Sequence, residues 1–224
     1  MSNPWKNISF KKTIADCDAN FINSLSAKTK SRLELRTLPE PYHGNPDANV
    51  YVLNGNPRAS EEDLNFVGNV IYEKEVQDEL AHENTEFLWL RTPETIVDRN
   101  GNPYPGYKYW KDRTKELRIG EGTPNLFCVE LFPYHTLNVK DFGAIKDLQN
   151  LPSNQYTDSL ILKAIEAGKY IVLMRCARLW FERIPKLKGH GKLATLSSVQ
   201  NVCLSKKNIC LPAGIDWEEF LKSL

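Results

Sequence analysis

The sequence has no apolar run that could cross a bilayer. Its longest such runs, for example residues 170–174, are much shorter than the roughly 20 residues that a membrane-spanning helix needs. The N-terminal residues 1–6 also lack the charged and then apolar pattern of a secretory signal. We therefore expect a cytoplasmic protein without a membrane partner.

An excess of one charge is missing as well. The 29 Lys and Arg residues against 28 Asp and Glu residues give a formal net charge of +1, so no global field draws the chain to a polyanion. The five cysteines are widely spaced and form no C-x-x-C, which argues against a zinc ribbon or an iron–sulfur cluster. We expect reduced thiols, no bound metal and no cofactor.

Several familiar motifs are absent. The chain contains neither G-x-G-x-x-G nor G-x-x-x-x-G-K-[ST], so nothing local supports binding of a dinucleotide or a nucleoside triphosphate. It contains no G-x-S-x-G, which argues against a serine hydrolase of the usual α/β kind. With 224 residues and no internal repeat, we expect a single domain over residues 1–224 with an insertion at residues 84–106.

Charge is less balanced in one stretch near the C-terminus. DNA binding requires several phosphate contacts from Lys and Arg, so this stretch is the surface that could contact DNA. The alternative is a basic face that contacts only water. The stretch has no acid and holds Arg183, Lys186, Lys188, Lys192, Lys206 and Lys207.

Alternating strand and helix patterns indicate the fold. Short apolar runs at residues 50–53, 126–132 and 170–174, and a fourth within 194–204, predict buried strands. Strands that alternate with helices imply right-handed crossovers and parallel pairing. We therefore expect an α/β protein, a three-layer α/β/α sandwich with a four-stranded mainly parallel sheet.

Helices should cover both faces of that sheet. Ser60 begins a capping-box pattern, and Gly168 provides a helix stop. In the insertion, short extended runs at 87–90 and 95–97 precede a segment rich in turn formers and predict a small hairpin near the site. The expected helices span residues 10–25, 29–35, 60–82 with a break near 66–69, 107–119, 140–148, 153–167, 177–185 and 217–224.

Polar side chains follow the predicted strands. Ligands of α/β proteins bind beyond the carboxyl ends of parallel strands, so these side chains should form the site. Phosphate is disfavoured at the helix after the first strand, because Glu61, Glu62 and Asp63 occupy the positive end of its dipole. Amides there could read the edge of a base, since each carries a donor and an acceptor. The candidates are Asn54, Asn56, Arg58, Tyr134, His135, Arg175, Arg178, Ser198, Asn201 and Ser205.

His135 is one of only four histidines. Its position after a strand makes it a candidate acid, electrophile or hydrogen-bond donor. The alternative is a histidine that satisfies a loop carbonyl.

One part of the chain resembles a known family. The run Leu-Pro-Glu-Pro-Tyr-His-Gly at 38–44, the strand ending at Leu53 and the turn Asn-Gly-Asn-Pro at 54–57 resemble the first motif region of the uracil-DNA glycosylase superfamily. They are nearest to its mismatch-specific and single-strand-selective branches, whose motif is G-[IM]-N-P-G. Residues 170–180 are similar to the third strand and helix of that superfamily. Arg58 stands where the family has glycine, and the nearest placement of the second motif is residues 198–205.

The resemblance implies a base-excising hydrolase that acts on a nucleobase flipped out of DNA. By this resemblance, Asn56 positions the attacking water, and Phe66 is the aromatic that stacks on the base. His135 or a polar group near Ser198 would stabilise the leaving base. Tyr42 and Tyr134 would add stacking, worth roughly 1–3 kcal/mol per base. Two alternatives are a non-catalytic α/β protein that binds a nucleic acid, a small molecule or a protein, and an enzyme that acts on a free nucleoside.

Overall fold

The computed structural model describes residues 1–90, 95–118, 122–137, 150–198 and 200–224. Its central strands are β2 (Tyr42–Gly44), β3 (Val50–Leu53), β4 (Leu126–Val129), β6 (Tyr170–Leu173), β7 (Leu193–Leu196) and β8 (Ile209–Cys210). They form one sheet in the order β2-β4-β3-β6-β7-β8. The protein is therefore an α/β protein with a mixed six-stranded sheet.

The four strands predicted from the sequence form the centre of this sheet and pair in parallel. The expected four-stranded sheet is nevertheless wrong in strand number, because β2 and β8 add an antiparallel strand at each edge. These edge strands are three and two residues long, which is too short to give a periodic pattern in the sequence.

The register of the central strands aligns their carboxyl ends. Leu53 at the end of β3 lies between Val129 of β4 and Leu173 of β6. All three strands are buried along their whole length, because both faces of the sheet are covered. The residues that follow these strands therefore leave the sheet at the same edge.

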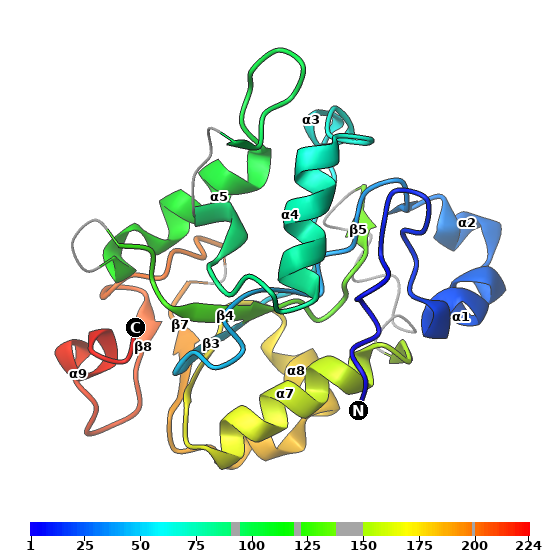
Figure 1. Ribbon diagram of the computed structural model, residues 1–224. Helices are drawn as coiled ribbons and strands as arrows, with labels where there is room; N and C mark the ends of the chain where they lie inside the picture. Colours follow the sequence, from blue (N-terminus) through cyan, green and yellow to red (C-terminus); the bar gives the residue numbers. More distant parts are fainter. Residues whose placement is uncertain (91–94, 119–121, 138–149, 199) are drawn as a thin grey trace.

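Helices lie on both sides of the sheet (Figure 1). On one side lie α4 (Val70–Leu80) and α5 (Pro105–Thr114), and on the other lie α7 (Asn154–Glu166) and α8 (Ala177–Arg183). No helix in the described parts of the chain has the length and apolar character needed to span a membrane. Further helical elements are α3 (Glu61–Leu64), η4 (Lys115–Leu117), η6 (Pro185–Gly189) and α9 (Trp217–Leu221).

Local capping signals are confirmed. Ser60 and Asp63 form a complete capping box at α3. The chain then breaks at residues 65–69, and Asn69 caps α4 by accepting hydrogen bonds from the backbone N–H groups of Ile71 and Tyr72. Asp216 caps α9 in the same way.

The expected N-terminal helix over residues 10–25 is largely wrong. Only η1 (Asp16–Asp18) and α1 (Ala19–Ser24) are helical there. The preceding chain packs against α4 instead, where Glu73 accepts a 2.6 Å hydrogen bond from the Phe10 backbone and Gln77 donates a 2.8 Å bond to the Ile8 carbonyl. These tertiary contacts replace the hydrogen bonds of a helix.

The expected helix at 29–35 is also corrected. The helix α2 (Ala27–Lys30) is followed by β1 (Leu33–Glu34), which pairs antiparallel with β5 (His135–Thr136). This pairing brings His135 to a defined place beside the sheet.

Within residues 84–106, the expected extended run at 87–90 is a 3₁₀ turn, η2 (Leu88–Leu90). A small hairpin does form further on, where Val97 bridges Pro103. Asp98 closes its turn by accepting hydrogen bonds from the backbone N–H groups of Asn100 and Asn102. The helix expected at 140–148 lies outside the described residues.

Candidate functional site

A pocket of about 530 Å³ opens at the carboxyl edge of the central strands. Asn54 lines it directly after β3, Glu130 after β4, and Arg175 with Cys176 after β6. The η2 turn, α5, and α3 with the segment before it also line the pocket. The location is the one that the strand order predicts for a ligand site.

Two polar side chains meet on the floor of this pocket. Asn54 Nδ2 donates a 2.8 Å hydrogen bond to Glu130 Oε1. The backbone of Asn54 is fixed by the Val129 carbonyl and by the indole N–H of Trp180, at 2.9 and 2.8 Å. The other oxygen of each side chain, Asn54 Oδ1 and Glu130 Oε2, is buried without a hydrogen-bond partner among the described residues. Two polar atoms are thus left for a ligand.

Burial raises the pKa of Glu130 to about 8, although the hydrogen bond from Asn54 works against this rise. At neutral pH the carboxyl group is therefore mainly protonated. Its Oε1 accepts from Asn54, so the proton resides on Oε2. The pair then offers one donor, Glu130 Oε2–H, and one acceptor, Asn54 Oδ1.

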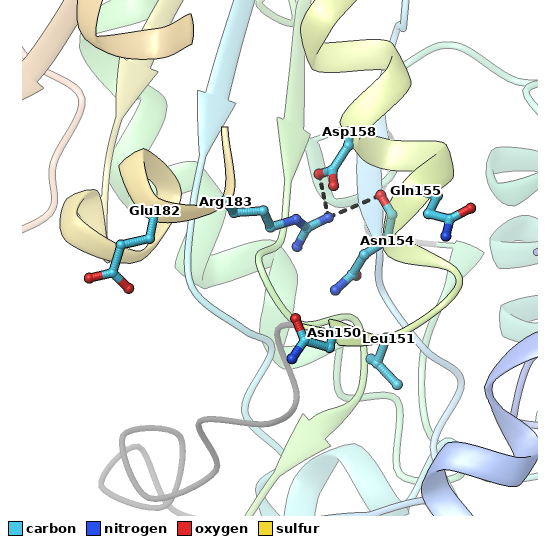
Figure 2. A pocket seen from close by; sticks show the side chains of 7 residues that line it. All are labelled: Asn150, Leu151, Asn154, Gln155, Asp158, Glu182 and Arg183. Carbon is cyan, nitrogen blue, oxygen red and sulfur yellow. Dashed lines mark hydrogen bonds and ion pairs between the residues drawn. The ribbon is translucent and has the colours of Figure 1, made fainter. Parts of the chain in front are cut away.

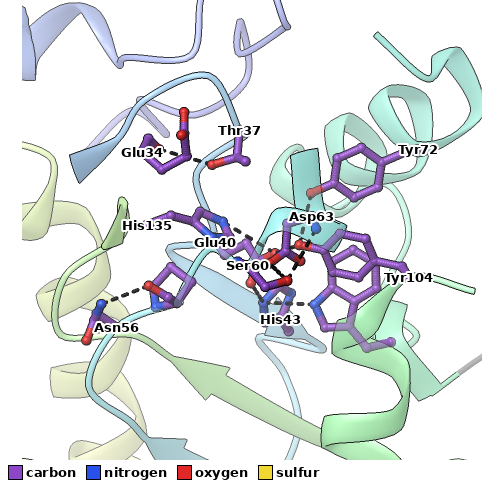
Figure 3. Close-up of polar contacts among 12 residues, drawn as sticks. Glu34, Thr37, Glu40, His43, Asn56, Ser60, Asp63, Tyr72, Tyr104 and His135 are labelled. Atoms are coloured by element: carbon purple, nitrogen blue, oxygen red, sulfur yellow. Dashed lines mark hydrogen bonds and ion pairs between the residues drawn. The ribbon is translucent and has the colours of Figure 1, made fainter. Parts of the chain in front are cut away.

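A second polar group lines the pocket beside this pair. His135 Nε2 lies 3.6 Å from Glu40 Oε1, and neither ring nitrogen of His135 has a hydrogen-bond partner among the described residues. Tyr104 donates a 3.1 Å hydrogen bond to the same Glu40 oxygen (Figure 3). Burial opposes ionisation of Glu40, but the His135 and His43 imidazoles hold the pKa of this carboxyl below its usual value.

His43 lies behind Glu40 and is only 2% exposed. Its Nδ1 is 2.8 Å from Glu79 Oε2, and its Nε2 is 3.3 Å from Glu40 Oε2. Burial disfavours the charged imidazole, but the two carboxylates overcome this effect and raise the pKa of His43 to about 10.

Asn56 lines the pocket and is held next to His135 through the strand β5. Its Nδ2 donates 2.8 Å hydrogen bonds to Thr136 Oγ1 and to the Pro57 carbonyl. The backbone N–H of Thr136 also bonds the Pro57 carbonyl, at 3.2 Å. Both residues predicted as catalytic therefore belong to one pocket, and Asn56 Oδ1 makes no hydrogen bond with a described residue.

The upper wall of the pocket is aromatic. Trp89 and Tyr104 stack with ring centroids 4.2 Å apart, and Tyr109 and Trp110 extend this surface. Gly106 permits the close approach, because a Cβ atom there would lie 2.8 Å from the Tyr104 ring. A flat ligand could stack on such a wall.

Cations accompany the aromatic wall. Arg58 and Arg175 line the pocket and make no ion pair with a described residue. The guanidinium of Arg113 lies 3.6 Å from the centroid of Tyr109.

Seven predicted site residues lie outside this pocket, four of them in other parts of the fold and three in the loop after β7. The Tyr42 hydroxyl donates a hydrogen bond to the Leu80 carbonyl at 2.6 Å, and the Tyr134 hydroxyl donates one to Asp18 at 2.8 Å. Both phenols therefore make their hydrogen bonds within the core. Phe66 packs edge-on against Tyr104 and lines a neighbouring cavity of about 660 Å³. Arg178 is 79% exposed and forms an ion pair with Glu182.

The loop after β7 contributes no described residue to the pocket. Ser198 and Asn201 bond each other, and the Ser205 carbonyl accepts from the Asn208 backbone N–H at 3.0 Å. The Asn208 side chain donates hydrogen bonds to the backbone carbonyls of Asn201 and Cys203 in the same loop. The loop has its own internal structure.

The basic stretch from Arg183 to Lys207 does not form one surface. Arg183 is buried in a separate cavity of about 450 Å³, where it contacts Asp158 at 2.6 Å and the Asn154 carbonyl at 3.1 Å (Figure 2). Lys192 precedes β7 and Lys206 follows it, so they lie at opposite edges of the sheet. The prediction of a continuous DNA-contacting face is therefore not supported.

Sequence reasoning missed Glu40, His43 and Glu130 as parts of the site. Only Glu130 carried a usable signal, a lone carboxylate at the end of an apolar run. In the parts of the chain that the structure describes, no group of three or more His, Cys, Asp or Glu side chains could hold a metal ion. The chain matches no family model, and neither a curated protein nor a solved structure shows significant similarity to it.

Proposed function

We propose that this protein is a uracil-DNA glycosylase-like hydrolase, which binds a nucleobase in the pocket and cleaves its N-glycosidic bond. One observation carries the proposal. Buried polar atoms without partners, on Asn54, Glu130 and His135, share a pocket with an aromatic wall. A flat ring with polar edges fits both features, and a nucleobase is such a ring.

The floor pair has the polarity to read a base. Asn54 Oδ1 can accept a hydrogen bond from a ring N–H, and the protonated Glu130 can donate one to the adjacent carbonyl. This combination favours bases with neighbouring N–H and C=O groups, such as uracil and hypoxanthine. A base with an amino group in place of the carbonyl would leave the Glu130 proton unpaired.

The proposed reaction uses the second polar group. A water held by Asn56 Oδ1 attacks the anomeric carbon, and the C–N bond breaks with its electron pair going to the base. A protonated His135 stabilises the negative charge that develops on the base and transfers its proton to it. The water loses a proton to solvent, so the products are the free base and the sugar hemiacetal.

A non-catalytic binding protein is the second candidate. The specific observation in its favour is that the loop after β7, where the family carries its second motif, contributes no described residue to the pocket. Such a protein would bind the base or nucleotide without releasing it.

The test is an assay of base release. Oligonucleotides containing uracil, hypoxanthine or mismatches, and the free nucleosides, are incubated with wild type, Asn56→Ala and the control Asn201→Ala, which lies outside the pocket. We expect release by wild type and control, with a loss of about 10²- to 10⁴-fold in Asn56→Ala.

Binding measured in parallel separates the candidates. Binding without release from any substrate would contradict the hydrolase and support the binding protein. The absence of both binding and release would contradict both. Release from free nucleosides but not from oligonucleotides would support an enzyme that acts on small molecules.

A further inference from the structure

A chain of three buried ionisable side chains runs from the core to the pocket. Glu79 in α4 contacts His43 in β2, and His43 contacts Glu40, which reaches His135. The three side chains of this array, Glu79, His43 and Glu40, are at most 9% exposed. Burying a charge costs free energy unless the charge is paired. The contacts of these three side chains therefore determine which of their atoms carry protons.

The contacts of Glu79 determine where the proton between Glu79 and His43 resides. Glu79 Oε1 accepts hydrogen bonds from the backbone N–H groups of Gly44 and Leu88, at 2.9 and 3.1 Å. Its Oε2 receives His43 Nδ1 at 2.8 Å. A carboxylate that accepts from backbone donors acts as an acceptor towards the imidazole as well, so His43 Nδ1 carries a hydrogen.

The other ring nitrogen has two competing neighbours. Glu40 Oε2 and Trp89 Nε1 both lie 3.3 Å from His43 Nε2. The indole N–H can only donate, so it would pair with a neutral imidazole, whereas Glu40 would pair with an imidazolium. A charge-assisted bond to a carboxylate is roughly twice as strong as a neutral one, so the contact with Glu40 prevails.

We propose that His43 is a buried imidazolium and a positioning residue, which holds Glu40 as a carboxylate against His135 and so keeps a proton on His135 Nε2. The inference rests on the proposed function, in which His135 donates that proton. With two carboxylates and one imidazolium, the array has a net charge of −1 next to His135. A carboxylate can only accept a hydrogen bond, so Glu40 beside Nε2 favours the form of His135 that carries a hydrogen on this nitrogen.

Other ionisable groups surround this array. Glu34 pairs with His135 across β1 and β5 and is bound by Arg36 at 2.7 Å. Tyr104 bonds Glu40, and Tyr72 and Asp63 lie within electrostatic range on the α3–α4 side. On the β4 side Glu130 interacts with His43 and Glu40. The carboxylates of Glu34 and Asp63 reinforce the negative field, and Arg36 offsets that of Glu34. Glu130 adds little charge at neutral pH, because burial raises its pKa to about 8.

The charge state can be measured without substrate. The ¹⁵N NMR signals of ring-labelled histidines distinguish an imidazolium from a neutral tautomer. We expect both nitrogens of His43 to be protonated at pH 7.5 and to remain so until about pH 10. In Glu79→Gln, His43 should lose its proton at lower pH. A neutral His43 at pH 7.5, with Nε2 accepting from Trp89, would overturn the inference.

The same spectra report on positioning. We expect an Nε2–H signal for His135 in the wild type, and its loss to solvent exchange in Glu40→Gln and in His43→Gln. The matched control is His82→Gln, because His82 bonds Tyr156 away from the pocket. An unchanged His135 signal in both array variants would show that the array is merely structural. Thermal melting confirms which variants fold.

Activity gives the second readout. We expect Glu40→Gln and His43→Gln to lower kcat by about 10- to 100-fold with little change in KM, as for loss of acid catalysis. If the wild type releases no base, the proposed function fails, while the NMR result still decides the charge state. A change in KM alone would contradict the positioning role.

Discussion

Asn54 donates a 2.8 Å hydrogen bond to Glu130, and this contact joins the ends of two neighbouring parallel strands on the floor of the pocket. It uses one oxygen of the carboxyl group and leaves the other without a partner among the described residues. Because burial keeps this carboxyl protonated at neutral pH, the floor is a donor–acceptor pair without a net charge.

The first prediction concerns ligand binding and pH. Wild-type affinity for a uracil or hypoxanthine nucleoside should fall as pH rises through about 8, because Glu130 then ionises and loses the proton that it donates. Glu130→Gln keeps a donor and does not titrate, so its affinity should stay constant across the same range. Fluorescence titrations from pH 6 to 9 measure this difference. Parallel curves for the two proteins would contradict the role of Glu130 as a donor.

The second prediction concerns stability and pH. The pKa of Glu130 is higher in the folded protein than the usual value for Glu, so the folded state binds the proton more tightly. The free energy of unfolding should therefore fall as pH rises from about 4.5 to about 8. In Glu130→Gln this part of the loss should disappear. Urea denaturation at pH 5, 7 and 9 measures it, with the exposed Glu218→Gln as control.

His43 contributes to the same curve at higher pH. Its pKa is raised from 6.5 to about 10, so its stabilising effect is complete below pH 6.5 and is lost as pH rises to about 10. Glu130→Gln should therefore still lose stability between pH 8 and 10. A flat curve in that range would show that His43 is neutral in the folded protein.

The parallel centre of the sheet could be predicted because its strands are buried on both faces. Their apolar runs, such as residues 50–53 and 170–173, therefore stand out from the surrounding sequence. The edge strand β2 could not be predicted from the sequence. Its three residues include His43, whose burial depends on Glu79 far along the chain. Contacts between distant residues leave no local pattern.

Part of the site could be predicted, because some of its residues directly follow the apolar runs of the central strands. Asn54, Asn56 and Arg175 follow strand ends, and the parallel register alone brings them to one pocket. The partners of Glu40 are in β2, in β5 and at Tyr104 just before α5, so no sequence spacing reveals them. Tyr42 and Tyr134 were predicted to stack on a base, but their hydroxyls bond to core residues that only the folded chain brings near.

The third prediction concerns Gly44 in the edge strand. Its φ is +89°, and a Cβ atom would lie 2.2 Å from the Leu126 carbonyl oxygen. The matched control is Gly214, which has φ +87° and open space around it. Gly214→Ala should cost about 1–2 kcal/mol of stability from backbone strain. Gly44→Ala should cost about 1–3 kcal/mol more from overpacking, as measured by urea denaturation. Equal losses in both variants would contradict the close approach.

The fourth prediction concerns the two guanidiniums that line the pocket. Arg58 and Arg175 make no ion pair with a described residue, so each is available for a phosphate of a nucleic-acid ligand. Affinity for single-stranded DNA should therefore fall with salt, and each of Arg58→Gln and Arg175→Gln should reduce the slope of log K against log salt by about 0.7.

The control for these variants is Arg178→Gln, because Arg178 is exposed, paired with Glu182 and outside the pocket. It removes the same charge and should leave the slope almost unchanged. Equal slopes for all three variants would mean that phosphate contacts are not made at the pocket. If the DNA affinity of the wild type does not depend on salt concentration, phosphate contacts are excluded altogether. A neutral nucleoside would then be the ligand that fits the aromatic wall and the Asn54–Glu130 pair.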